Sequence, residues 1–222
     1  MTLSELTPWV YAFLASSVLV GPFVAWLRPN YWGIALGATA VAIAGLFIEL
    51  LAEDAVSPLI AATVTLVLIG PLTEEVLKFL ASGSLGANFA SAAGVGIGFA
   101  ATENALYFWS AWGGPLEQLA LLIAIRAATD PLLHSTATTL TTLTWRGRPW
   151  GFPAGLALHM SWNFATLVYV LVDPLAGLLL LLAAGLAVLG ILLLLRGSPA
   201  IRDDLDNATW LHVWSGAVAL RT

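Results

Sequence analysis

Residues 175–195 read LAGLLLLLAAGLAVLGILLLL and contain no charged or hydrogen-bonding side chain. A helix of this length rises about 30 Å, which matches the hydrocarbon core of a lipid bilayer. The rest of the chain has the same bias, because 59% of its 222 residues are hydrophobic and only 9% are charged. A soluble domain carries roughly a quarter charged residues. The composition therefore predicts an integral membrane protein.

Other apolar runs of similar length precede this one, so we expect an all-α fold, a polytopic bundle of about seven transmembrane helices. The fifth run is longer than a bilayer requires and is expected to be tilted or kinked. Residues 1–196 then form one membrane domain, and residues 197–222 form a short cytoplasmic tail. The predicted spans are 8–27, 33–51, 58–81, 90–111, 117–145, 152–171 and 175–195.

The charges between these spans separate by sign when the spans are laid out alternately across the membrane. Because Lys and Arg are enriched in cytoplasmic loops, we expect the N-terminus outside and the C-terminus in the cytoplasm. The protein is then a multi-pass protein of the cell membrane, in contact with membrane lipids. The cations on one side are Arg28, Arg146, Arg148, Arg196 and Arg202, and the acids on the other side are Glu5, Glu53, Asp54, Glu117 and Asp173.

The tail begins with a helix breaker and an acidic, polar run, and then becomes apolar. Trp210 and Trp214 lie four residues apart, so they share one face and indicate a short interfacial helix. The chain contains no cysteine, which excludes disulfide bonds and thiolate chemistry. We expect no nucleic-acid partner, and the sequence leaves open whether the protein forms a homo-oligomer.

Ionisable and strongly polar side chains interrupt four consecutive spans, between residues 58 and 171. An ionisable group at the centre of a bilayer costs at least ~2.5–3.5 kcal/mol, so each of them is a functional candidate. Depths estimated from the helical rise place them in the cytoplasmic half or near the midplane. These spans are therefore predicted to enclose a polar core. Its candidate residues are Glu74, Glu75, Lys78, Glu103, Asn104, Tyr107, Arg126, Asp130, His134, His159 and Asn163.

The spacing of the polar residues within each span predicts which of their side chains can contact one another. Lys78 follows Glu75 by three residues and Glu74 by four, so its ammonium group can reach either carboxylate. The other carboxylate then projects elsewhere and is available as a general base. His159 and Asn163 are four apart and share a face of their helix.

The fifth span contains further pairs and a proline. His134 and Thr138 are four residues apart and share a face, and Arg126 and Asp130 are expected to form a structural pair within the helix. Pro131 is predicted to break the helix just before His134, freeing a backbone carbonyl that is tolerated at depth where it lines a cavity.

Four segments carry these residues in order along the chain, and together they resemble a known family. The segments are PLTEEVLK (71–78), GFAATENALYF (98–108), RAATDPLLHSTATT (126–139) and LALHMSWN (156–163). Their order and spacing are similar to those of the PrsW family of membrane proteases. That family is distantly related to the CAAX-prenyl-protease and bacteriocin-processing superfamily of glutamic intramembrane proteases. The resemblance covers residues 70 to 165, nearly half of the chain.

The resemblance implies hydrolysis of a transmembrane protein or peptide, without a cofactor. One of the paired glutamates, Glu74 or Glu75, would activate water, with Glu74 favoured. Glu103 or His134 would position the water. His159 and Asn163 would donate hydrogen bonds to the oxyanion of the tetrahedral intermediate, as implied by the terminal HxxxN motif. The supporting residues implied around them are Lys78, Asn104, Tyr107 and Thr138.

One position departs from the related prenyl proteases, which carry His where this chain has Glu103 in the FxxxE motif. A mechanism in which that His binds the attacking water cannot be transferred unchanged, and His134 is expected to take its place.

Three other functions stay open from the sequence. A metal-dependent intramembrane hydrolase is the nearest, because Glu and His side chains are ligands for Zn²⁺, although the chain has no HExxH motif. A proton-coupled transporter or channel would also use a Glu/His cluster. A scaffold that retained the fold without catalysis is the third. Sensitivity to chelators would identify the first, and a relay of ionisable groups through both leaflets would indicate the second.

Overall fold

The structure is a computed structural model that describes residues 21–52, 63–110 and 116–199. The described residues form helices and contain no strand. A π-helical segment directly precedes α4, and a 3₁₀ turn follows α6. The elements are α2 (Tyr31–Ala52), η1 (Thr65–Ile69), α4 (Gly70–Ser84), α5 (Phe89–Ser110), α6 (Leu116–Thr142), η2 (Leu143–Arg146), α7 (Gly151–Leu171) and α8 (Pro174–Gly197).

The apolar runs of the sequence predicted these helices well. The predicted run 152–171 corresponds to α7 and the run 175–195 to α8, with ends that differ by no more than two residues. Only the end of the first predicted span is described, where residues 21–27 are helical. Most of the tail, including Trp210 and Trp214, lies outside the described residues.

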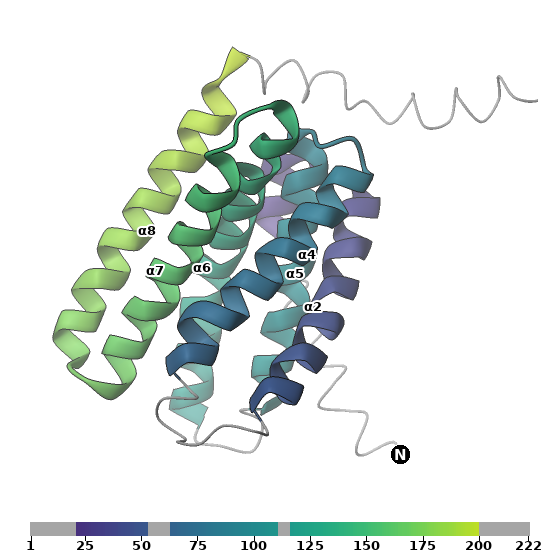
Figure 1. Cartoon of the computed structure of the whole chain (residues 1–222). Helices are drawn as coiled ribbons and strands as arrows, with labels where there is room; N and C mark the ends of the chain where they lie inside the picture. The colour runs from purple at the N-terminus through teal and green to yellow at the C-terminus, as the bar shows by residue number, and fades with distance from the viewer. Residues whose placement is uncertain (1–20, 53–62, 111–115, 200–222) are drawn as a thin grey trace, which may run out of the picture.

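The helices alternate in direction and form one bundle, with α2 at one side and α7 and α8 at the other (Figure 1). Helix α5 packs against both α2 and α6, and α6 packs in turn against α7. This alternation places the short loop with Arg146 and Arg148 and the end of α8 with Arg196 at one end of the bundle. Asp173, in the α7–α8 connection, lies at the opposite end, where its side chain accepts hydrogen bonds from the first amides of α8.

Glycines allow the central helices to approach closely, as small residues do in helix pairs. A Cβ atom on Gly94 of α5 would lie 3.2 Å from Cα of Gly33 of α2, so neither position accepts a side chain without moving a helix. A Cβ atom on Gly96 would lie 2.6 Å from the backbone carbonyl group of His134. Gly96 therefore brings α6 against α5 at the level of His134.

Pro131 does not break the helix, and this corrects the prediction from sequence. Helix α6 is continuous from Leu116 to Thr142 with Pro131 inside it. A proline removes one backbone donor and strains the preceding turn. Helices α5 and α7 both pack against α6, and Pro131 itself is buried in the bundle.

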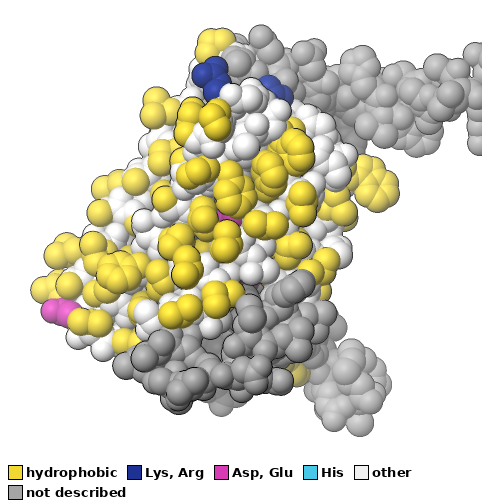
Figure 2. Space-filling model, in the orientation of Figure 1, with side chains coloured by type: hydrophobic (Ala, Val, Ile, Leu, Met, Phe, Trp, Pro, Cys, Tyr) yellow, Lys and Arg dark blue, Asp and Glu magenta, His cyan; other side chains and the backbone are white. Residues whose placement is uncertain are grey.

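Two described helices, α7 and α8, are long and apolar enough to cross a membrane. Helix α8 is apolar around its whole circumference and exposes many leucines, including Leu186 and Leu194, which are 71% and 76% exposed. Hydrophobic side chains cover the middle of the visible face, and the basic side chains lie toward one end (Figure 2). A helix exposed in this way is suited to lipid contact.

Candidate active site

The structure brings charged side chains from α4, α5, α6 and α7 into contact inside the bundle. We call this group the polar cluster, and its members are Glu74, Glu75 and Lys78 of α4, Glu103 of α5, Arg126 and His134 of α6, and His159 of α7. The sequence predicted that these four helices would share a polar core, and the observed contacts connect them.

Lys78 is at the centre of the polar cluster. It is completely buried, and its ammonium group lies 2.5 Å from Glu75 Oε1 and 4.0 Å from Glu74 Oε2. It also lies 2.9 Å from Nδ1 of His134 and stacks over the ring of Phe99 at 4.5 Å. A buried ammonium group is tolerated only when it is paired and hydrogen-bonded, and these contacts supply both conditions.

The contacts of His134 define the state of its ring. An ammonium group has only donors, so Nδ1 accepts a hydrogen bond from Lys78. Nε2 lies 2.9 Å from Glu103 Oε2, and a carboxylate only accepts, so Nε2 carries the proton and donates. Both ring nitrogens of His134 are therefore engaged, and the imidazole links α4 to α5.

Glu75 is held on one oxygen by two partners. Its Oε1 atom contacts Lys78 and accepts a hydrogen bond of 2.8 Å from Nδ1 of His159. The side chain of Glu75 is completely buried. Because Nδ1 of His159 donates to Glu75, the neutral ring has its lone pair on Nε2.

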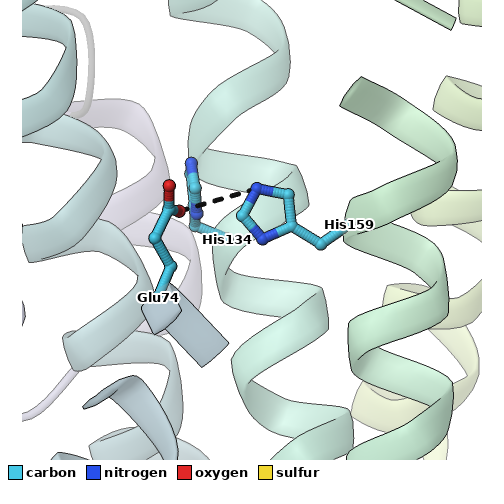
Figure 3. A group of neighbouring side chains, drawn as sticks. All are labelled: Glu74, His134 and His159. Atoms are coloured by element: carbon cyan, nitrogen blue, oxygen red, sulfur yellow. Dashed lines mark ion pairs between the residues drawn. The ribbon is translucent and has the colours of Figure 1, made fainter. Parts of the chain in front are cut away.

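Glu74 is the less constrained carboxylate of the pair. Its Oε2 atom lies 3.6 Å from Nε2 of His159 and has no hydrogen-bond partner among the described residues. The carboxylate lies next to the His134 ring and points toward His159 (Figure 3). Its side chain is 10% exposed, whereas that of Glu75 is fully enclosed. Glu75 Oε2 is also buried without a hydrogen-bond partner among the described residues, so the two glutamates differ in how closely Lys78 and His159 hold them and not in an unused oxygen.

Glu103 connects the polar cluster to a second group of contacts. Its Oε1 atom lies 3.3 Å from a guanidinium nitrogen of Arg126, which also pairs with Asp130 one turn later on the same helix. Arg126 Nε donates to Asn104 Oδ1 at 2.8 Å, and the guanidinium group lies over the ring of Tyr107 at 3.7 Å. Asn104 and Tyr107 thus support the cluster through Arg126.

The contacts of Arg126 extend beyond the intrahelical pair that the sequence indicated. The spacing to Asp130 is observed, but Arg126 also crosses from α6 to Glu103 and Asn104 on α5. The i, i+4 pattern gave no sign of the interhelical contact. The only available signal was the length of the side chain, which can reach a neighbouring helix.

Asn163 and Thr138 contact other groups. The amide of Asn163 donates to the backbone carbonyl of Leu66 in η1 at 2.8 Å. The hydroxyl of Thr138 is buried without a hydrogen-bond partner among the described residues. Its backbone carbonyl accepts from the hydroxyl of Thr142, one turn further toward the C-terminal end of α6. For these two residues the predicted roles stay predictions.

Three members of the polar cluster have the chemistry of a metal site. One ligand atom each from Glu74, His134 and His159 lies within 4.8 Å of the other two (Figure 3). A carboxylate and two imidazoles form a donor set found in zinc enzymes. Binding by all three, however, requires His134 to give up Lys78 or Glu103, because both of its nitrogens are engaged.

Comparisons with known proteins gave no neighbour. No family model, no curated protein and no solved structure matches the chain.

Proposed function

We propose that this protein is an intramembrane endopeptidase of the glutamic type, in which Glu74 activates water to cleave a peptide bond in a membrane-protein substrate. The observation that carries the proposal is the contrast between the two adjacent glutamates. Glu75 is fixed by Lys78 and His159, while Glu74 Oε2 faces the lone pair of His159 Nε2 at 3.6 Å. Glu75 is held by two short contacts and serves the framework, whereas Glu74 has only the longer contacts with Lys78 and His159 and is the carboxylate that we assign to accept a proton.

The geometry supports specific roles for Glu74, for His159 and for one water molecule in the reaction. Two acceptors that face each other at this distance can be bridged by one water molecule that donates a hydrogen bond to each. The water oxygen then attacks the carbonyl carbon of the peptide as Glu74 takes a proton from it. Collapse of the tetrahedral intermediate breaks the C–N bond, and the same proton, delivered through His159, passes to the leaving amine. No covalent enzyme intermediate is required.

His159, supported by Glu75, stabilises the negative charge that develops on the substrate. Glu74 then passes the proton taken from water to Nε2 of His159, 3.6 Å away, and the resulting imidazolium is stabilised by the Glu75 carboxylate on Nδ1. The protonated Nε2 can then donate a hydrogen bond to the oxyanion that develops on the substrate. A carboxylate that orients a histidine from its far nitrogen has the same role in hydrolases with other nucleophiles.

The proposed setting is the bilayer, with about seven spans and the C-terminus in the cytoplasm. The support comes from the two helices that are apolar enough to cross a membrane, from the exposed leucines of α8, and from the separation of Arg146 and Arg148 from Asp173. In this setting the substrate is a transmembrane segment of another protein. The motifs that resemble the PrsW family carry the polar cluster, and we place the chain in that family as part of the same proposal.

A metal-dependent hydrolase is the second candidate, and the proximity of Glu74, His134 and His159 favours it. A Zn²⁺ ion bound there would supply a metal-activated water. The contacts of His134 with Lys78 and Glu103 favour the metal-independent mechanism, because they fix the tautomer without an ion.

The test is hydrolysis by the purified protein in proteoliposomes, with a pool of synthetic single-span transmembrane peptides and product detection by mass spectrometry. Wild type is compared with Glu74→Gln, Glu75→Gln and His159→Ala, each with and without a chelator. Asp173→Asn is a matched control, because it also converts an acid to its amide but at the opposite end of α7.

We expect loss of cleavage in the three site variants, normal cleavage in Asp173→Asn and no effect of the chelator. Unchanged cleavage in the Glu74 and His159 variants would reject the glutamic mechanism. Cleavage by wild type that is lost only with the chelator, and restored by Zn²⁺, would establish the metal-dependent alternative.

A further inference from the structure

The segment that leads into the paired glutamates has a defect in its backbone hydrogen bonding. Residues Thr65–Ile69 form a π-helix, and the amide of Gly70 donates to the carbonyl of Thr65, five residues earlier. The next residue is Pro71, which has no amide hydrogen. The carbonyl of Leu66 therefore lacks both donors that a helix could offer it, since its i+4 donor is used and its i+5 residue is proline.

A side chain from another helix supplies the missing donor. The Nδ2 group of Asn163 on α7 donates to the Leu66 carbonyl at 2.8 Å. Asn163 follows His159 by four residues, so the two side chains lie on the same face of α7, one turn apart. His159 contacts Glu75, and Asn163 contacts η1, which lies directly before the helix that carries Glu75. Helix α7 thus holds α4 at two points, one at the carboxylates and one at the backbone before them.

We propose that Asn163 is a positioning residue that fixes the start of α4, and through it Glu74 against His159, by occupying the carbonyl that Pro71 leaves without a donor. This inference rests on the proposed function for its catalytic readout, and it assigns Asn163 to the backbone of η1 instead of to the oxyanion. π-Helical turns are rare and occur often at functional sites. Here the π turn and Pro71 together create the acceptor that Asn163 binds.

Asn163 could donate to the Leu66 carbonyl or to the oxyanion, and only the first role can be replaced by a backbone donor at residue 71 of α4. Pro71→Ala gives residue 71 an amide hydrogen, and this hydrogen is positioned to donate to Leu66 in the π register. A backbone donor makes the side-chain donor redundant if the role of Asn163 is to satisfy Leu66. It has no effect on a missing oxyanion donor. Pro71 lies outside the proposed catalytic residues, so Pro71→Ala alone is expected to keep its activity.

The experiment is a double-mutant cycle of Asn163→Leu and Pro71→Ala in the full-length protein, read by peptide turnover and by thermal unfolding in the same detergent. Asn163→Leu keeps the side-chain volume and removes the donor. It is expected to lower turnover roughly 10- to 100-fold, the effect of a misplaced catalytic group, and to lower the melting temperature. The double variant is expected to recover both. Pro71→Ala added to His159→Gln is the control, and it should recover neither.

Recovery of thermal stability without recovery of turnover would overturn the proposal, because Asn163 would then act on the reacting groups. No recovery of either property would also overturn it. If no variant or wild type cleaves any peptide, the proposed function fails, but the thermal half of the cycle still tests the contact.

A second measurement does not depend on whether Pro71→Ala folds. In wild type labelled with ¹⁵N-asparagine and [1-¹³C]leucine, a cross-peak between an asparagine side-chain nitrogen and a leucine carbonyl carbon is expected, and it should disappear in Asn163→Gln or Asn163→Leu. Its absence from wild type would contradict the contact directly.

Discussion

At the scale of single residues, the polar cluster distinguishes two glutamates that are adjacent in sequence. The spacing of Lys78 allowed it to pair with either one. The structure places its ammonium group 2.5 Å from Glu75 and 4.0 Å from Glu74. The sequence could not predict this choice, because it depends on His159, which arrives from α7 and holds the same oxygen of Glu75. The sequence identified the candidate residues, because burying ionisable groups in a membrane costs free energy. It did not identify which of these residues contact one another.

Removing the central cation tests this assignment through stability. Lys78→Met leaves the Glu75 carboxylate buried without its cation, and His134 without its donor on Nδ1. We expect the free energy of unfolding to fall by about 3–5 kcal/mol, as for other buried ion pairs that lose one partner. Reversible unfolding in mixed micelles measures it.

The matched control for that variant is Arg196→Met, which removes a cation that stacks on Trp26 at the end of the bundle. It should change the free energy of unfolding by no more than about 1 kcal/mol. Equal losses in the two variants would mean that Lys78 is not the centre of the cluster.

At the scale of helices, the location of each element was predictable and its contacts were not. Runs of apolar residues predicted α7 and α8 nearly to the residue, because hydrophobic length is a local property of the chain. The π-helical segment, the continuity of α6 through Pro131 and the interhelical reach of Arg126 were not predicted. Each of these depends on backbone hydrogen bonding or on a neighbouring helix, which a local pattern does not contain.

The close approach of α5 to α6 has a direct test at Gly96. A Cβ atom at this position would lie 2.6 Å from the backbone of His134, so Gly96→Ala must push the two helices apart. We expect a loss of about 1–3 kcal/mol in stability from overpacking, and at least about a tenfold loss of turnover from the shift of His134 relative to Glu103.

Gly45→Ala is the control for Gly96→Ala, because a Cβ atom at Gly45 on α2 would meet nothing within 4 Å. It should keep full turnover and gain up to about 1 kcal/mol from the better helix former. Normal turnover in Gly96→Ala would show that the α5–α6 spacing at His134 is unimportant for the reaction.

At the scale of the whole molecule, the proposed topology places the loop of Arg148 in the cytoplasm and the α7–α8 connection outside. Because the chain contains no cysteine, single cysteines can be introduced without background. We expect a membrane-impermeant maleimide to label Val172→Cys in intact cells. Arg148→Cys should be labelled only after the membrane is permeabilised. The reverse pattern would invert the orientation, and labelling of both in intact cells would contradict a multi-pass arrangement.

The central claim is that Glu74 is the base that activates water. The most direct measurement is the turnover number of Glu74→Gln relative to wild type, in proteoliposomes that contain a chelator, with Asp173→Asn alongside. We expect full turnover of wild type and Asp173→Asn, and a loss of at least about 100-fold in Glu74→Gln, the contribution of a general base. Turnover of Glu74→Gln within a few-fold of wild type under these conditions would contradict the central claim.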